Sequence, residues 1–200
     1  KTTVYSGDAV ASFTLNVPDI IASPVKKSET FYYGSEGSEK ADYTLSYKGT
    51  TTATNIPKDT TFYFYGTSQK RLSAAGVSDT DAMNQSVTIA GDLVSVEASV
   101  LSASIIANKI VISAATYLLD TRTYYTGTSG DEKASCSYKY WTSGTERVAK
   151  ETTVYTYATA GNLEKTTVYS GDAVESFTLN VPAIIASPVK KSETFYYGSE

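Results

Sequence analysis

The feature that most constrains this chain is a repeat, because its first 36 residues and residues 165–200 have nearly the same sequence. The two segments begin 164 residues apart. They differ only where Ala11 becomes Glu175 and where Asp19 becomes Ala183. Near-identity at a fixed spacing indicates tandem duplication, so the chain corresponds to one full period and the start of the next. The two differences argue against simple copying, although an engineered duplication is the alternative to a natural array.

A second, more diverged repeat lies inside this period. The stretch KDTTFYFYGT at Lys58–Thr67 matches KETTVYTYAT at Lys150–Thr159, and SGDAV at Ser6–Val10 matches AGDLV at Ala90–Val94. The two matches have different shifts because one copy carries an insertion, so the period holds two modules of about 80 residues each. The expected organisation is a first module at 1–67, a linker at 68–85 with a helical turn from about Gln69 to Ala75, a second module at 86–164 and the start of a further module at 165–200.

The sequence predicts an all-β fold of tandem, small immunoglobulin-like β-sandwich modules. The chain contains 17 Tyr residues against one Met and one Trp, and aromatic and β-branched side chains suit a pleated sheet. Apolar and polar residues alternate in ADYTLSYKG (41–49) and in KASCSYKYW (133–141), which is the period of half-buried strands. About six or seven such strands per module suit a β-sandwich. The residues expected in its core are Leu45, Phe62, Phe64, Tyr138 and Val154.

Two glycine-containing stretches are expected to form hairpin turns. GSEGSEK (Gly34–Lys40) and GTSGDEK (Gly127–Lys133) follow tyrosine pairs in the two modules. Glycine and small polar residues between strands are typical of such turns. We therefore align the pair Tyr32-Tyr33 with the pair Tyr124-Tyr125.

One stretch carries a family resemblance. YTLSYKGTTTATNI at Tyr43–Ile56 resembles the strand, turn and strand of immunoglobulin-like modules that are arrayed in prokaryotic secreted and cell-surface proteins, which often carry Y-T-x-x-x-x-G-x-x-x-A-T-N. The resemblance covers 14 residues, and PKDTTFYFYG replaces the Asp-x-Leu-Pro turn that follows in that family. It implies an extracellular array with a spacing, fibre-forming or adhesive role. No catalytic or ligand residue is carried over from it.

The residue types do not favour an enzyme. Histidine is absent, which removes the commonest general base and metal ligand. A lone Cys136 on the apolar face of an alternating strand is expected to be a core residue. Asp79, Asp81 and Asn84 carry oxygen ligands of the kind that calcium prefers, but their small number favours a solvated linker. We expect no catalytic residue, no metal and no cofactor.

Charge and hydropathy argue against two classes of partner. The net charge is −4 and like charges do not cluster, so the attraction that drives nucleic-acid binding is missing. No apolar run in the sequence approaches the roughly 18 residues that a helix needs to span a bilayer. We therefore expect neither nucleic-acid binding nor membrane insertion.

Tyrosine side chains supply the candidate interaction surface. The stretch TFYFYG alternates phenylalanine with tyrosine, and if the phenylalanine face is core, a row of tyrosines is left outside. Exposed tyrosines pack on neighbouring modules or chains, or stack on sugars. The candidate residues are Tyr63, Tyr65, Tyr155 and Tyr157.

These features favour a structural role at the cell surface or outside the cell. The expected function is a repeat unit of an extracellular fibre, filament or surface stalk, whose partners are copies of itself or neighbouring repeats. The alternative is an adhesin or carbohydrate-binding module that uses the tyrosine-rich surfaces to bind glycans. Lys165–Glu200 contains the early strands of a module but not its later ones. We expect its open strand edges to be completed by a neighbouring chain or repeat, or to pack on the second module.

Overall fold

The structure, a computed structural model, describes residues 1–5, 10–14, 17–20, 25–48, 56–66, 77–91, 105–106, 109–112, 115–143, 146–178 and 180–197. Within these residues the chain is all-β, as expected, and it contains no helix that could span a membrane. The helical turn expected from about Gln69 to Ala75 lies outside the described residues. Residues 49–55 of the stretch that carries the family resemblance lie outside them as well.

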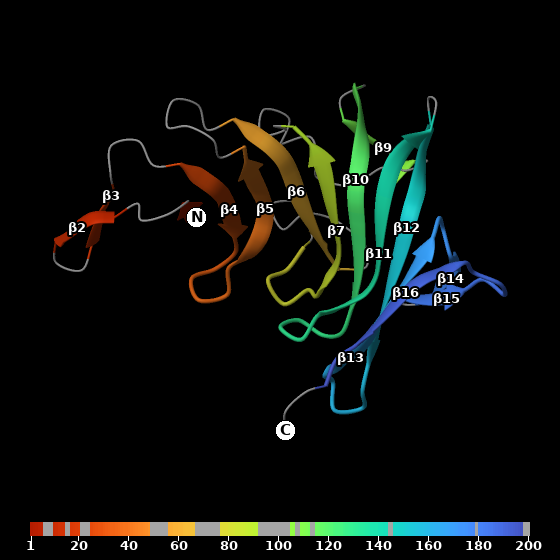
Figure 1. Cartoon of the computed structure of the whole chain (residues 1–200). Helices are drawn as coiled ribbons and strands as arrows, with labels where there is room; N and C mark the ends of the chain where they lie inside the picture. Colours follow the sequence, from red (N-terminus) through yellow and green to blue (C-terminus); the bar gives the residue numbers. More distant parts are fainter. Residues whose placement is uncertain are drawn as a thin grey trace.

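Ten of the described strands follow one another across a single antiparallel sheet, which Figure 1 shows as one twisted, curved layer. We group them into three strand sets, in the order in which they lie in the sheet. The first set is β1 (Thr2–Tyr5), β4 (Lys26–Tyr33), β5 (Lys40–Tyr47) and β6 (Pro57–Tyr65); the second is β7 (Met83–Ala90), β10 (Ala115–Thr126), β11 (Lys133–Ser143) and β12 (Glu146–Tyr157); the third is β13 (Leu163–Ser170) and β16 (Lys190–Phe195).

Each strand set carries a short hairpin between its first and second strands. The hairpins are β2 (Val10–Thr14) with β3 (Val17–Ile20), β8 (Ile105–Ile106) with β9 (Lys109–Ile112), and β14 (Val174–Thr178) with β15 (Val181–Ile184). The first hairpin stands away from the sheet beside β4, whereas β9 also pairs with β10 (Figure 1). The first and third hairpins therefore hold equivalent positions, whereas β8–β9 lies further along the chain from the first strand of its set.

The expected β-sandwich is not observed among the described strands. The two predicted modules lie side by side in one sheet, because β6 pairs with β7 and β12 pairs with β13. The reason is that Met83–Ala90 is a complete strand, although the predicted linker at 68–85 includes its first residues. It pairs with β6 on one side and with β10 on the other, so the sheet continues from one strand set to the next.

One face of the sheet carries the core. Leu45, Phe62, Phe64 and Tyr138 are buried there as expected, while Val154 is half-buried and packs against them. Other core side chains are Tyr43, Val87, Ile89, Leu119, Cys136 and Tyr140. Cys136 is fully buried, and burial raises the pKa of its thiol to about 12. A neutral, buried thiol is a packing residue and not a nucleophile.

Equivalent residues of the first two strand sets make the same contacts. The Thr60 hydroxyl donates to the Gly91 carbonyl at 2.7 Å, and the Thr152 hydroxyl donates to the Gly171 carbonyl at 2.6 Å. The amide of Gly91 donates to the Lys58 carbonyl at 2.7 Å, and that of Gly171 donates to the Lys150 carbonyl at 2.9 Å. Both glycines have positive φ, 101° and 71°, which a side chain would strain. The alignment of Lys58 with Lys150 is therefore confirmed.

Candidate interaction surfaces

Two joints connect the strand sets, and both are made by sheet pairing. In the first joint, β6 pairs with β7 and Phe62 lies opposite Val87. In the second joint, β12 pairs with β13 and Val154 lies opposite Thr167. Main-chain hydrogen bonds between the paired strands hold both joints together. Each joint therefore depends on the backbone of a whole strand and not on a few side chains.

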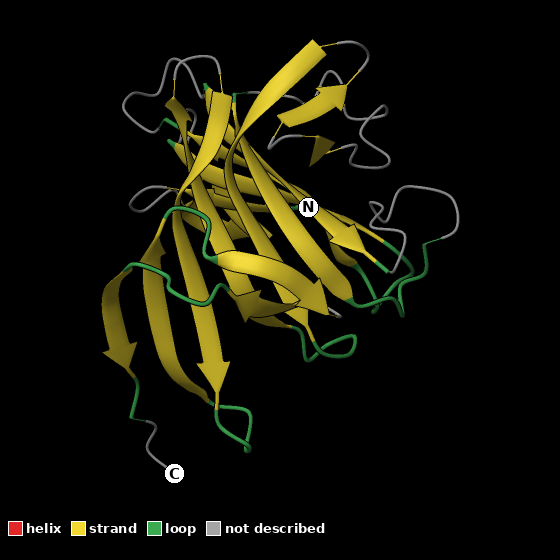
Figure 2. Ribbon diagram, turned by 90° about the vertical axis from the view of Figure 1, so that its right-hand side faces the viewer, coloured by secondary structure: helices red, strands yellow, loops and turns green. Residues whose placement is uncertain are grey.

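The hairpin β14–β15 adds a second contact across the β12–β13 joint. It turns back from β13 and lies across the longer strands of the second set, as the side view in Figure 2 shows. The Phe177 ring lies 4.4 Å from the Tyr124 ring, centroid to centroid, and 6.5 Å from the Tyr138 ring in an edge-to-face arrangement. Aromatic pairs at these separations are attractive beyond the area that they bury. Phe177 therefore anchors the hairpin.

The turn of this hairpin forms hydrogen bonds with three strands. Asn180 has a φ of 64°, and its side-chain amide donates to the Asn84 carbonyl at 3.1 Å and to the Tyr125 carbonyl at 3.0 Å. The Ser135 hydroxyl donates to the Asn180 carbonyl at 2.6 Å. The β10–β11 register shifts between Tyr124 and Tyr125, which interrupts the regular ladder at this point. Asn180 thus fills a gap in the hydrogen bonding of the sheet.

An open pocket of about 240 Å³ lies between the hairpin and the sheet. Its lining includes Arg122, Tyr140, Asp172 and Glu175. Burial raises the pKa of the Tyr140 phenol, so this hydroxyl stays neutral. The Arg122 Nε donates to the Gln85 Oε1 at 2.9 Å. The pocket offers aromatic faces, hydroxyls and both signs of charge, a combination suited to a small polar molecule.

Two of the four candidate tyrosines lie on the polar face of the sheet. Tyr63 and Tyr155 are half-buried. Their hydroxyls lie 3.2 Å from the Thr44 Oγ1 and 3.3 Å from the Ser137 Oγ, respectively, within hydrogen-bond distance. These contacts join neighbouring strands, so both tyrosine side chains already have partners within the sheet.

The other two candidate tyrosines follow a break in the strand alternation. The pairing register shifts between Phe64 and Tyr65, and Tyr65 is consequently only 3% exposed, which corrects the expectation that it lies outside. Its hydroxyl donates to the Ala41 carbonyl at 2.7 Å. Tyr157 follows the same kind of shift, is half-buried and donates to the Ala134 carbonyl at 2.8 Å. The structure does not gather the four tyrosines into one exposed surface.

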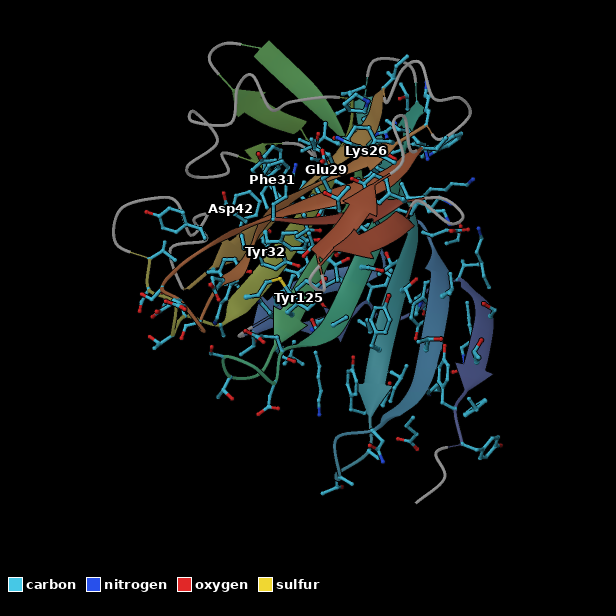
Figure 3. The ribbon with its side chains drawn as sticks, turned by 90° about the vertical axis from the view of Figure 1, so that its left-hand side faces the viewer. Lys26, Glu29, Phe31, Tyr32, Asp42 and Tyr125 are labelled. Carbon is cyan, nitrogen blue, oxygen red and sulfur yellow. The ribbon has the colours of Figure 1, made fainter. Side chains whose placement is uncertain are left out.

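A buried carboxylate joins the first strands of the sheet (Figure 3). Glu29 Oε1 lies 2.8 Å from the Lys1 Nζ and 3.0 Å from the Lys26 Nζ, and the Tyr47 hydroxyl donates to its other oxygen. Burial alone would raise the pKa of Glu29, but the hydrogen bonds from Lys1, Tyr47 and Lys26 lower it from 4.5 to about 2. Glu29 is therefore ionised under all ordinary conditions.

Glu193 lies in the same local sequence as Glu29, but the sheet has no counterpart of β5 beside it among the described strands. Glu193 Oε1 lies 3.4 Å from the Lys165 Nζ, and its other oxygen lies 3.0 Å from the Lys190 Nζ. Its side chain is 25% exposed, against 6% for Glu29. The difference arises because β5, which supplies Tyr47, covers Glu29, whereas β16 is the last described strand of the sheet. The outer edge of β16 therefore matches the edge of β4 that β5 occupies.

Acid should destabilise the fold through Glu29. Because its pKa is lower in the folded chain, its stabilisation is complete above pH 4.5 and is lost as the pH falls towards 2. We expect the native chain to lose about 3 kcal/mol more unfolding free energy between pH 5 and pH 2 than Glu29→Gln does. Denaturant titrations at several pH values measure this, with Glu193→Gln as the matched control. Equal acid sensitivity in Glu29→Gln and the native chain would contradict the assignment.

The hairpin residues Phe177 and Asn180 were missed by reasoning from the sequence. The sequence signal that could have identified them is their presence in both near-identical segments, where the equivalent residues are Phe13 and Asn16. In the linker, the Ser78 amide donates to the Asp81 carboxylate at 2.9 Å, which closes a turn. Within the described ranges, no group of three or more His, Cys, Asp or Glu side chains is placed to hold a metal ion.

Comparison with known proteins found no matching family model, no matching curated protein and no matching solved structure.

Proposed function

We propose that this chain is a structural repeat unit of an extracellular fibre, filament or surface stalk, in which successive units join edge to edge as one continuous sheet. The observation that carries the proposal is the equivalence of the two joints. β6 meets β7 as β12 meets β13, with the same threonine-to-glycine hydrogen bond in each. A joint that recurs within one chain can recur along an array.

The edges of the sheet support the same proposal. β1 and β13 come from the near-identical segments, and each pairs with its next strand in one register: Val4 lies opposite Ser28, and Val168 lies opposite Ser192. β13 uses its other edge to bind β12. The outer edge of β1 has the same sequence and therefore suits a strand of the β12 type. The partners of this chain are then copies of the same unit.

The second candidate is an adhesin or carbohydrate-binding module. The pocket beneath the hairpin β14–β15 favours it, because Tyr138, Tyr140 and Asp172 line an open cavity beside Arg122. Aromatic faces beside carboxylate and hydroxyl groups are suited to sugar rings. The polar tyrosines Tyr63 and Tyr155 offer a less accessible surface, since both are half-buried.

The two functions differ in what an array of several periods does. We expect chains with one, two and three copies of the 164-residue period to grow by a constant increment of maximum dimension, because each joint adds strands to the same sheet. Small-angle X-ray scattering and electron microscopy measure this length. Longer chains that stay compact would contradict the structural role. Glycan binding that is lost in Tyr140→Ala, but kept in Tyr63→Ala, would instead support the pocket of the second candidate.

A further inference from the structure

The segment Lys1–Ile20 carries the same two docking elements as residues 165–184. One element is an edge strand, β1 or β13, and the other is a hairpin, β2–β3 or β14–β15. The hairpins also share their register, since Phe13 lies opposite Pro18 and Phe177 lies opposite Pro182. The two segments therefore have the same backbone pairing over both elements, and their sequences differ at only two positions.

In residues 165–184 both elements are bound to the second strand set. β13 pairs with the outer edge of β12, while the hairpin contacts Tyr124, Tyr125 and Ser135. We call this combined surface, the β12 edge with the face of β10 and β11 under the hairpin, the seat. Ala173 is fully buried in the seat, and its amide donates to the Thr152 hydroxyl at 3.1 Å. The seat thus recognises a strand and a hairpin together.

The two positions at which the segments differ do not obstruct the seat. Glu175, where the first segment has Ala11, is exposed at the mouth of the pocket. Ala183, where the first segment has Asp19, is exposed as well. Neither residue makes the Phe177 or Asn180 contacts, so the first segment retains every side chain that holds the hairpin in place.

The second strand set carries a different hairpin. The stretch that aligns in sequence with β14–β15 is VSVEASVLSASII at 94–106, and it contains neither the phenylalanine nor the asparagine that anchor β14–β15. The anchoring side chains thus belong only to the two near-identical segments. This specifies which segment fits the seat.

We infer that Lys1–Ile20 is a docking segment for a second copy of this chain, whose seat on β10, β11 and β12 it occupies in place of residues 165–184. The inference rests on the proposed function and adds the partner surface and the exchange to it. Residues 165–184 are part of the same chain as the seat that they fill, so their effective concentration there is high. A second copy can therefore bind only when residues 165–184 leave the seat. The N-terminal segment of one copy and the C-terminal segment of another then compete for one site.

The test uses the full chain with two reporter cysteines, Val4→Cys and Thr153→Cys. Thr153 lies opposite Val168 in the seat, so Val4 of a second copy would lie opposite Thr153 only after exchange. Native Cys136 is fully buried and does not interfere. The variant Thr167→Pro weakens β13, because proline lacks the amide hydrogen that a strand donates. Thr3→Pro is the matched change in the other copy.

We expect Thr167→Pro to raise the yield of disulfide-linked oligomers by about tenfold over the reporter chain alone, because it frees the seat. Their masses should be multiples of 21.4 kDa. Adding Thr3→Pro should abolish them. Moving the second cysteine out of register, to Glu151→Cys, should abolish them as well.

Two results would overturn the inference. One is a monomeric Thr167→Pro reporter, and the other is cross-linking that persists with Thr3→Pro or out of register. If Thr167→Pro fails to fold by circular dichroism, the pair Phe177→Ser and Asn180→Ala loosens the hairpin instead and is judged by the same cross-link. If arrays lengthen with each period while the reporter stays monomeric, the proposed function stands and the exchange between copies fails.

Discussion

Removing residues 165–200 is expected to turn the chain into a head-to-tail polymer. The cut after Glu164 exposes the outer edge of β12 and the face of β10 and β11 that Phe177 covers. The outer edge of β1 and the hairpin β2–β3 have the matching sequence, so each shortened chain carries both halves of one joint. Sedimentation velocity at rising concentration should show a growing series of oligomers, whereas the 200-residue chain should remain mainly monomeric.

The sequence leaves two outcomes open for residues 165–200, and the structure has the second of them, packing on the second module. Completion by a neighbouring chain would instead make only the longer chain self-associate. Because β13 already pairs with β12, the segment closes a joint instead of opening one. Thr3→Pro in the shortened chain is the control, and it should restore the monomer because it weakens β1. A folded shortened chain that stays monomeric at all concentrations would contradict the shared joint.

Phe64→Ala is expected to lower the free energy of unfolding by about 3–5 kcal/mol. Phe64 is 0% exposed and lies opposite Gln85 at the β6–β7 joint, so the substitution leaves a cavity between two strand sets. The matched control is Thr156→Ala, because Thr156 holds the equivalent place in β12 and is exposed. We expect that control to change stability by less than about 0.5 kcal/mol. Denaturant unfolding measures both.

A small effect of Phe64→Ala would place its side chain outside the core and would remove the packing argument for a shared sheet. A loss confined to part of the unfolding transition would show that the strand sets unfold separately. A single transition shifted by the full amount is what one continuous sheet predicts.

Local alternation predicted the individual strands well. The structure contains β5 at ADYTLSYKG and β11 at KASCSYKYW. The two glycine-containing stretches connect paired strands, as expected. Four of the five expected core residues are buried, and the fifth is half-buried. These features depend on neighbouring residues of one strand, for which a two-residue period is sufficient.

Pairing across the joints could not be predicted in this way. The alternation assigns residues to the two faces of a strand but does not say which strand lies beside it. MNQSVTIA at β7 follows a stretch rich in polar and small residues, so its start was assigned to the linker. Its role became visible only in its pairing with β6 and β10.

Bulges caused the remaining errors. A register shift after Phe64 places Tyr65 in the core, and similar shifts follow Phe31 and Tyr124. Phe31 and Tyr124 therefore hold equivalent places, and the alignment of the two tyrosine pairs was wrong by one residue. A bulge inserts one extra residue into a strand and has no clear sequence signal. The alternation of the strand therefore changes at a point that the sequence does not reveal.

One sheet runs through the first two strand sets and into the third. Cross-strand backbone nuclear Overhauser effects at the two joints test it most directly, because they require neighbouring strands to lie within a few ångströms. A continuous sheet predicts contacts between Phe62 and Val87 and between Val154 and Thr167. Their absence, together with contacts that close each strand set on itself as two facing sheets, would contradict it.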